Sequence, residues 1–124
     1  MFENTQAFSS FAVDDLRKAR EFYGETLGIK VTDGPEESLI TVHLGGEPTM
    51  VYEKPDLEPG NYTILNFPVD DVEQTVDELI SRGVSFEHYE GIGQDEKGIY
   101  RGEGPTIAWF KDPAGHILSV LNMD

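Results

Sequence analysis

The candidate ligands for a divalent metal ion in this sequence are its three histidines and Glu53, which lies on a predicted strand. Imidazole and carboxylate groups suit zinc, nickel, manganese and iron. His43, His88 and His116 are scattered along the chain and lack the close spacing of a local metal motif. We therefore expect surface or structural roles for them, and keep a metal site built from Glu53 with His43 or His88 as an alternative.

Other catalytic motifs are missing from the sequence. It contains no Gly-x-Ser-x-Gly nucleophile motif, no Gly-x-Gly-x-x-Gly that opens a helix and no Walker loop. The glycine-rich stretch GIGQDEKG, residues 91–98, lacks the strand-to-helix setting of a phosphate loop. Cysteine is absent, which excludes disulfides and thiol catalysis.

The charge balance restricts the partners. Among 124 residues, 24 are acidic and 9 are basic, which gives a formal net charge of −15. Such a surface repels phosphate backbones, so we expect no nucleic-acid partner, and it favours cationic ones. The first residues, MFENTQAFSS, lack a basic segment and a long apolar run, and no stretch is apolar enough for a membrane span. These features predict a cytoplasmic protein with no membrane partner.

The first half of the chain predicts a strand, a helix and three further short strands. Residues 8–13 read as a strand, and Asp14 or Asp15 can cap the helix that follows. An apolar stripe runs along that helix until Gly28. Residues 29–31 begin the next strand, and 39–44 and 49–53 read as a hairpin.

The second half predicts the same order of elements. A strand over 64–69 precedes a helix capped by Asp70 or Asp71 and ended by Gly83. A strand over 84–88 follows, and 106–111 and 116–121 form a hairpin about the Asp-Pro-Ala-Gly turn. The glycine-rich, charged segment 90–104 is inserted before this hairpin, and such loops often cover or line sites.

A repeated tetrapeptide supports an internal duplication. Residues 13–16 read Val-Asp-Asp-Leu, and residues 69–72 read Val-Asp-Asp-Val. Each half therefore has the order β-α-β-β-β, which predicts an α+β fold. We expect one domain, with module one at about 5–54, a linker at 55–61 and module two at about 62–122.

The segments VDDLRKAREFYGETLG and WFKDPAGHILSVL resemble the glyoxalase/bleomycin resistance/dioxygenase superfamily, also called vicinal oxygen chelate. The resemblance covers almost the whole chain. It implies that each βαβββ module curls its mixed sheet into a half-closed cup, with a cavity that a dimer partner often completes. Members of the superfamily include isomerases, dioxygenases, epimerases, transferases and pure binding proteins.

The resemblance also implies where metal ligands would lie. Counted from the Asp-Leu and Asp-Pro-x-Gly motifs, the positions are Phe8, Ile64 and Ser119, with Val51 as the best register on the strand 49–53. None of these is a competent ligand except, weakly, serine. We therefore predict no metal cofactor bound in the family manner. The bleomycin-resistance branch likewise lacks metal, is acidic and dimeric, and sequesters a cationic drug.

Strand alternation and flanking aromatic residues give a candidate ligand-binding set. Its members would surround an apolar cavity with a few polar points, which is typical of a pocket for an organic ligand. Alternatively, the strands fill their own interior and leave no pocket. The predicted set is Phe8, Ser10, Val51, Glu53, Ile64, Asn66, Tyr100, Trp109 and Ser119.

The favoured interpretation is a homodimeric small-molecule-binding protein, serving resistance or sequestration, whose ligand is cationic or aromatic. The first alternative is a metal-dependent enzyme of the lactoylglutathione-lyase or dioxygenase type with displaced ligands. The second is a protein-interaction module. The sequence assigns no catalytic residue.

Overall fold

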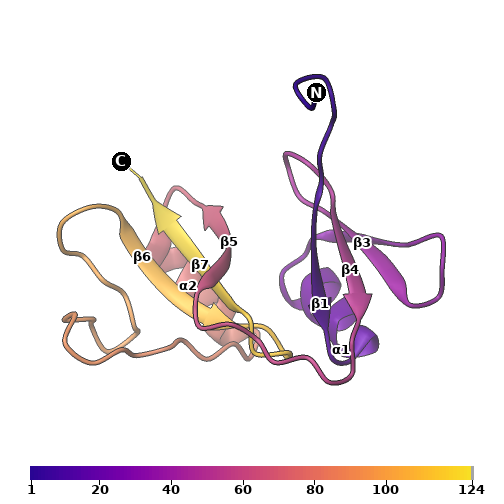
Figure 1. Ribbon diagram of the computed structural model, residues 1–124. Coiled ribbons are helices and arrows are strands. Elements are labelled where there is room, and N and C mark those ends of the chain that lie inside the picture. Colours follow the sequence, from indigo (N-terminus) through magenta and orange to yellow (C-terminus); the bar gives the residue numbers. More distant parts are fainter. Residues whose placement is uncertain (124) are drawn as a thin grey trace. The chain divides into compact units, whose positions relative to one another are not determined.

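The computed structural model describes residues 1–123 and divides into two compact units, Met1–Glu58 and Pro59–Asp124 (Figure 1). The division falls inside the segment 55–61 that the sequence predicts as a linker. Each unit carries its own sheet and helix. Within residues 1–123, no helix has the length and apolar character needed to cross a bilayer.

The first unit is a four-stranded mixed sheet with a helix packed on it. Asp15 caps the helix by accepting a hydrogen bond from the Lys18 N–H at 3.1 Å. The helix widens into a π turn that buries Tyr23, whose ring lies 5.8 Å from that of Phe11. The strand order is β1-β4-β3-β2. The elements are β1 Ser9–Val13, α1 Leu16–Glu21, η1 Phe22–Thr26, β2 Lys30–Asp33, β3 Leu39–His43 and β4 Thr49–Glu53.

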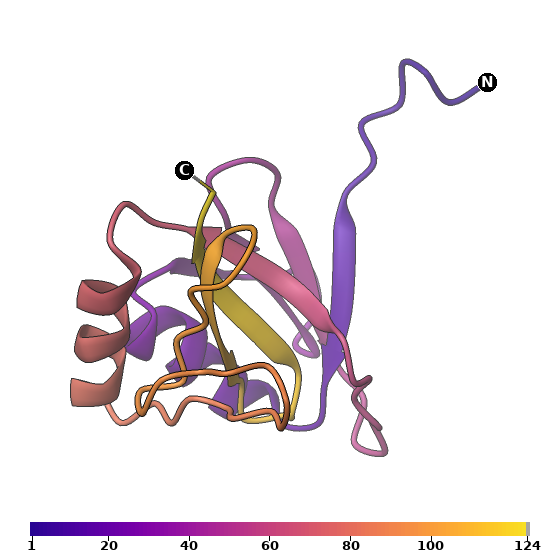
Figure 2. The same cartoon turned by 90° about the vertical axis from the view of Figure 1, so that its left-hand side faces the viewer.

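The second unit is a three-stranded sheet of order β5-β7-β6, with α2 along one face (Figure 2). Asp71 caps α2 through the Gln74 N–H at 3.0 Å, and its apolar stripe Val72, Val76 and Leu79 is buried. The elements are β5 Thr63–Pro68, α2 Val72–Ser81, β6 Thr106–Lys111 and β7 Ile117–Asn122. The α+β fold with two βαβββ-type mixed sheets is confirmed.

The predicted strand over 84–88 is wrong. Only one isolated bridge, Phe86 to Phe110, remains of it in the described residues. The Gln94 side chain takes the place of a neighbouring strand. Its amide nitrogen donates to the carbonyls of Glu87 (2.9 Å) and Gly98 (2.7 Å), and its oxygen accepts from the Tyr89 N–H (2.6 Å). Because these backbone groups are already bonded, the chain turns away after one bridge.

The register of β4 also differs from the prediction. Ser10 pairs with Met50 in the parallel β1–β4 ladder, just as Asn66 pairs with Ser119 in β5–β7. Met50, and not Val51, is therefore the counterpart of Ser119. Val51 pairs with Phe11, which contacts Tyr23, so Val51 lies on the helix-facing side of its sheet.

Candidate ligand-binding site

An open pocket of about 650 Å³ lies within the second unit. Its volume is in the range of small-molecule sites. The end of the linker, the β6–β7 hairpin and the segment after the Phe86 bridge all contribute to it. The lining residues are Pro59, Gly60, Asn61, Tyr62, Thr63, Tyr89, Trp109, Lys111, Gly115 and Ile117.

The Asp-Pro-Ala-Gly turn shapes the end of the pocket. The buried Asp112 carboxylate accepts hydrogen bonds from the N–H groups of Ala114 (3.0 Å) and His116 (2.9 Å). Gly115 adopts a φ of 95°, and a Cβ atom there would lie only 2.9 Å from Pro59 Cγ. The turn therefore fixes the direction of β7 and lets Pro59 approach the hairpin closely.

Three aromatic rings border the pocket. The Trp109 and Tyr89 ring centroids are 5.5 Å apart at 73°, which is an edge-to-face pair. Tyr62 is 66% exposed, and its ring lies against Gly60, where a Cβ atom would approach Tyr62 Cε1 to 2.3 Å. The absence of a side chain at Gly60 thus leaves space for the Tyr62 ring. Such rings offer planar faces and edges to an organic ligand.

One cation is among the lining residues. Lys111 Nζ lies 3.6 Å from Glu87 Oε1, and about half of the Lys111 side chain is exposed. Burial, followed by the charge of Glu87, raises the pKa of Tyr89 above its usual value. The Tyr89 phenol is therefore neutral at physiological pH and can donate a hydrogen bond.

The structure places only Trp109 of the predicted site residues in the pocket lining. Two other predicted residues contact each other, because the Ser119 hydroxyl donates to Asn66 Oδ1 at 2.5 Å. Ile64 is half-buried on β5. Tyr100 exchanges backbone hydrogen bonds with Ile107 and so extends the outer edge of β6.

The other predicted residues belong to the first unit. Phe8 and Ser10 are exposed at the start of β1, and Val51 is fully buried. Glu53 Oε2 accepts the Leu16 N–H at 2.9 Å, so this carboxylate bonds to the first residue of α1. Val51 and Glu53 thus both lie on the helix-facing side.

The candidate metal donors do not fit a metal site. In β3, His43 Nε2 bonds to Thr32 Oγ1 at 2.8 Å, while Glu53 lies at the far end of the β3–β4 pairing. In the second unit, His88 Nε2 bonds to the carbonyl of Glu96 at 3.2 Å. Residues 1–123 contain no group of three or more histidine or acidic side chains placed to hold a metal ion.

Sequence reasoning missed most of the lining. Tyr62, Tyr89 and Lys111 were not singled out for it, and Pro59 and Gly60 were assigned to a linker. One signal was available for Lys111, because it lies two residues after Trp109 and therefore on the same face of β6. Tyr89 could not be found in this way, because it reaches the pocket only where the chain leaves the sheet after the Phe86 bridge.

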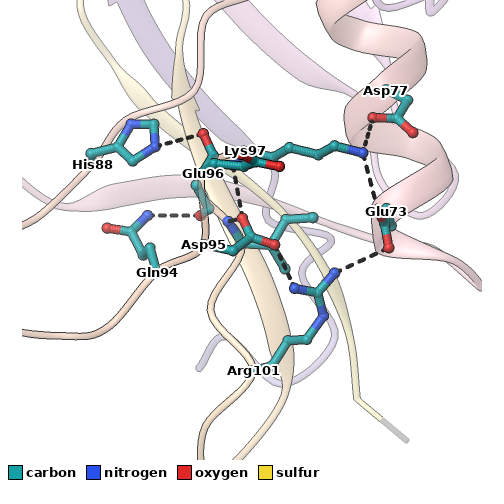
Figure 3. Close-up of polar contacts among 10 residues, drawn as sticks. Glu73, Asp77, His88, Gln94, Asp95, Glu96, Lys97 and Arg101 are labelled. Carbon is teal, nitrogen blue, oxygen red and sulfur yellow. Dashed lines mark hydrogen bonds and ion pairs between the residues drawn. The ribbon is translucent and has the colours of Figure 1, made fainter.

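The inserted segment 90–104 does not contribute to this pocket in the described residues. It is fastened to α2 instead (Figure 3). Lys97 Nζ bridges Glu73 (3.1 Å) and Asp77 (2.8 Å), and Arg101 bridges Glu73 (3.2 Å) and Asp95 (2.5 Å). The segment is therefore held against the helix by a shared network of ion pairs.

Asp95 connects this network to the backbone of its own segment. Burial opposes its ionisation, but hydrogen bonds from the Ile99 N–H, the Arg101 guanidinium and the Lys97 N–H outweigh that effect and lower the pKa of Asp95. The bond to Asp77, followed by that to Glu73, raises the pKa of Lys97. Both groups are thus held in their charged forms.

Comparison with known proteins identifies the family. The sequence matches the Glyoxalase/Bleomycin resistance protein/Dioxygenase superfamily over residues 6–120. The chain belongs to this superfamily. The family resemblance of the sequence is thereby confirmed, although none of the curated proteins matches the sequence significantly.

Solved structures share the superfamily fold over nearly their whole length. TnmS3, an antibiotic binding protein from Streptomyces sp. CB03234, is 24% identical, with 98% of each chain covered and a TM-score of 0.70. A superfamily member from Sphaerobacter thermophilus DSM 20745 is also 24% identical, with 94% of this chain and 97% of that chain covered and a TM-score of 0.67. Lactoylglutathione lyase from Agrobacterium tumefaciens is 17% identical, with 95% and 93% covered and a TM-score of 0.68. At these identities the likeness shows the fold, which a binding protein and a lyase share.

Proposed function

We propose that this protein binds a planar aromatic small molecule in the pocket bordered by Trp109, Tyr89 and Tyr62. The pocket of about 650 Å³ with three aromatic residues in its lining is the observation that carries the proposal. Its volume would accommodate a molecule of several fused rings. An edge-to-face pair adjoining an open face leaves ring surface on which a flat ligand can stack.

Two further facts support a binding role rather than metal-chelate chemistry. The candidate donors Glu53, His43 and His88 each bond elsewhere within their own unit. TnmS3, which has the same fold, is described as an antibiotic binding protein. Sequestration of an organic compound is the biological role that we propose, with the protein acting as a homodimer. Light scattering at several protein concentrations would measure the mass of the assembly.

The single tryptophan of the chain makes the proposal directly testable. The Trp109 indole N–H gives one side-chain resonance in a ¹H–¹⁵N NMR spectrum, and that residue lines the pocket. We expect the uncharged planar probe 2-naphthamide to shift this resonance in a saturable way. A molecule of this size should bind with a dissociation constant of about 1 mM or lower.

A matched pair of variants localises the binding. Tyr89→Ala should weaken the affinity about three- to tenfold, because it removes one ring of the edge-to-face pair. Tyr52→Ala in the first unit should leave it unchanged, and the two tyrosines have nearly equal exposure, 38% and 39%. An unshifted Trp109 resonance, or equal weakening by both variants, would contradict the proposal.

A further inference from the structure

We infer that the ligand of this pocket is an aromatic carboxylate, whose anionic group is bound by Lys111. The inference rests on the proposed function and specifies its ligand class. It differs from the expectation of a cationic ligand that the acidic composition suggests. The relevant charge is the one that a bound molecule meets in the pocket, and Lys111 is the one charged residue of the described lining.

The geometry of Lys111 leaves its ammonium group able to donate a hydrogen bond to another partner. Its Nζ lies 3.6 Å from Glu87 Oε1, whereas an ammonium-carboxylate hydrogen bond is about 2.7–2.9 Å long. The contact is therefore an ion pair without a hydrogen bond. About half of the Lys111 side chain is exposed, so solvent or a ligand can reach it. An ammonium group has three donors, and a ligand carboxylate can take one of them directly.

The position of Lys111 relative to the rings determines the shape of the ligand. Lys111 lies two residues after Trp109 on the same face of β6, and it pairs with Ile117, another lining residue. A flat molecule stacked beside Trp109 would thus direct a substituent along the strand toward the ammonium group. Tyr89 is a neutral phenol, so it adds a donor and no opposing charge.

The net charge of −15 does not exclude an anionic ligand. At physiological ionic strength, charges separated by more than about 8 Å are largely screened in solvent. A carboxylate in direct contact with Lys111 is affected chiefly by its near neighbours, and Glu87 is the acidic one that the structure places beside that lysine. Glu87 therefore competes with a ligand carboxylate for the Lys111 ammonium group. Removing the Glu87 charge should strengthen ligand binding, whereas removing the Lys111 charge should weaken it.

The experiment compares three probes with the same ring system and different charges. 2-Naphthoate is anionic, 2-naphthamide is neutral and 2-naphthylmethylammonium is cationic. Affinities are measured by NMR titration of the Trp109 indole resonance. We expect 2-naphthoate to bind about tenfold more tightly than the amide, the gain of one charge-assisted hydrogen bond.

Three variants assign that preference to its residues. Lys111→Met should reduce the affinity for 2-naphthoate to that for the amide, and Glu87→Gln should increase it severalfold because the competing carboxylate is gone. Lys54→Met is the matched control: Lys54 is 49% exposed against 48% for Lys111 and pairs with Asp56 in the first unit. It should change neither affinity.

The outcomes separate the inference from the proposed function. If none of the three probes binds, the proposed function fails and the inference fails with it. If the amide binds as tightly as 2-naphthoate, or Lys111→Met leaves the preference intact, the pocket binds aromatic molecules but the inference is overturned. Tightest binding of the cationic probe, lost in Glu87→Gln, would also overturn it and assign recognition to Glu87.

Discussion

The two modules use the same strand positions for different side chains. Thr41 pairs with Met50 across the β3–β4 ladder, where Trp109 pairs with Ser119 across β6–β7. Two residues further along, the first module has His43 and the second has Lys111. The pocket-forming residues of β6 thus occupy positions that are small or hydrogen-bonded in β3. The two modules share a backbone pattern, so a few side chains determine which of them forms the pocket.

The modules also differ at the edge of their sheets. In the first module, β2 pairs with β3 over four residues. In the second, the corresponding segment makes one bridge at Phe86 and then leaves the sheet, which brings Tyr89 against Trp109. The shortened strand of the second module thus accompanies an aromatic pair, Tyr89 and Trp109, beside its sheet.

One feature is the same in both modules. The last strand position, Glu53 or Asn122, bonds to the backbone at the start of the helix. Glu53 accepts the Leu16 N–H at 2.9 Å, and Asn122 Nδ2 donates to the Asp70 carbonyl at 2.6 Å. The junction of strand and helix is thus maintained by different chemistry in each module.

The substitution Gln94→Ala should cause the largest loss of stability, because it removes the contacts that distinguish the sheet edge of the second module from that of the first. The substitution leaves the Tyr89 N–H and the carbonyls of Glu87 and Gly98 without their side-chain partner. We expect a loss of about 2 kcal/mol in the free energy of unfolding, measured by urea denaturation. Gln74→Ala, on the exposed face of α2, is the control and should not destabilise the protein. Equal stability of the two variants would show that the segment after Phe86 does not depend on Gln94.

A smaller effect should come from Gly115→Ala in the β6–β7 turn. The residue needs a φ of 95°, and its new methyl group would approach Pro59. We expect a loss of about 1–2 kcal/mol in thermal or urea unfolding, together with weaker binding of 2-naphthamide. Gly45→Ala, in the turn of the first module, has open space around it and no positive φ. If that control destabilises the protein as much, the turn of the second module has no special constraint.

The smallest expected change is a pH-dependent contribution of Asp95 to the free energy of unfolding. Its folded-state pKa is lowered, so the carboxylate contributes stability above its unfolded pKa of about 3.9, and this contribution is lost as the pH falls through the folded value. Asp95→Asn should therefore be less stable than the wild type at neutral pH, and the difference should disappear in acid. Urea unfolding at a series of pH values measures it. Glu90→Gln, in the same segment, is the control, and a gap that persists in acid would contradict the assignment.

Much of the fold followed from local patterns in the sequence. Each of the two Asp-Asp pairs predicted to cap a helix contains the residue that does so, Asp15 and Asp71, and the Asp-Pro-Ala-Gly turn forms as predicted, because each depends on neighbours a few residues away. The prediction of a strand at 84–88 was wrong because it depended on a contact outside the local pattern. Its apolar alternation is real, but the Gln94 side chain binds the Glu87 carbonyl, and periodicity contains no information about that contact.

The candidate site was harder to predict than the fold. Trp109, predicted as a ligand-binding residue on the hairpin strand 106–111, lies in the pocket lining, whereas the face of Val51 depended on a register that no motif in β4 fixes. A shift of one residue moves a side chain to the other face of a sheet. Tyr62 and Pro59 line the pocket because the chain between the modules folds over the Gly115 turn, a long-range contact that composition cannot indicate.

The inserted segment also bears on the exposed edge of its sheet. β6 is one of the two outer strands of its sheet, and an uncovered outer strand can pair with the strands of another chain and so start aggregation. Here Glu87 and Tyr100 form hydrogen bonds with the backbone of that strand, at Trp109 and Ile107. The ion pairs to α2 hold this covering in place. Segment 90–104 thus covers part of the β6 edge that the shortened strand leaves unpaired.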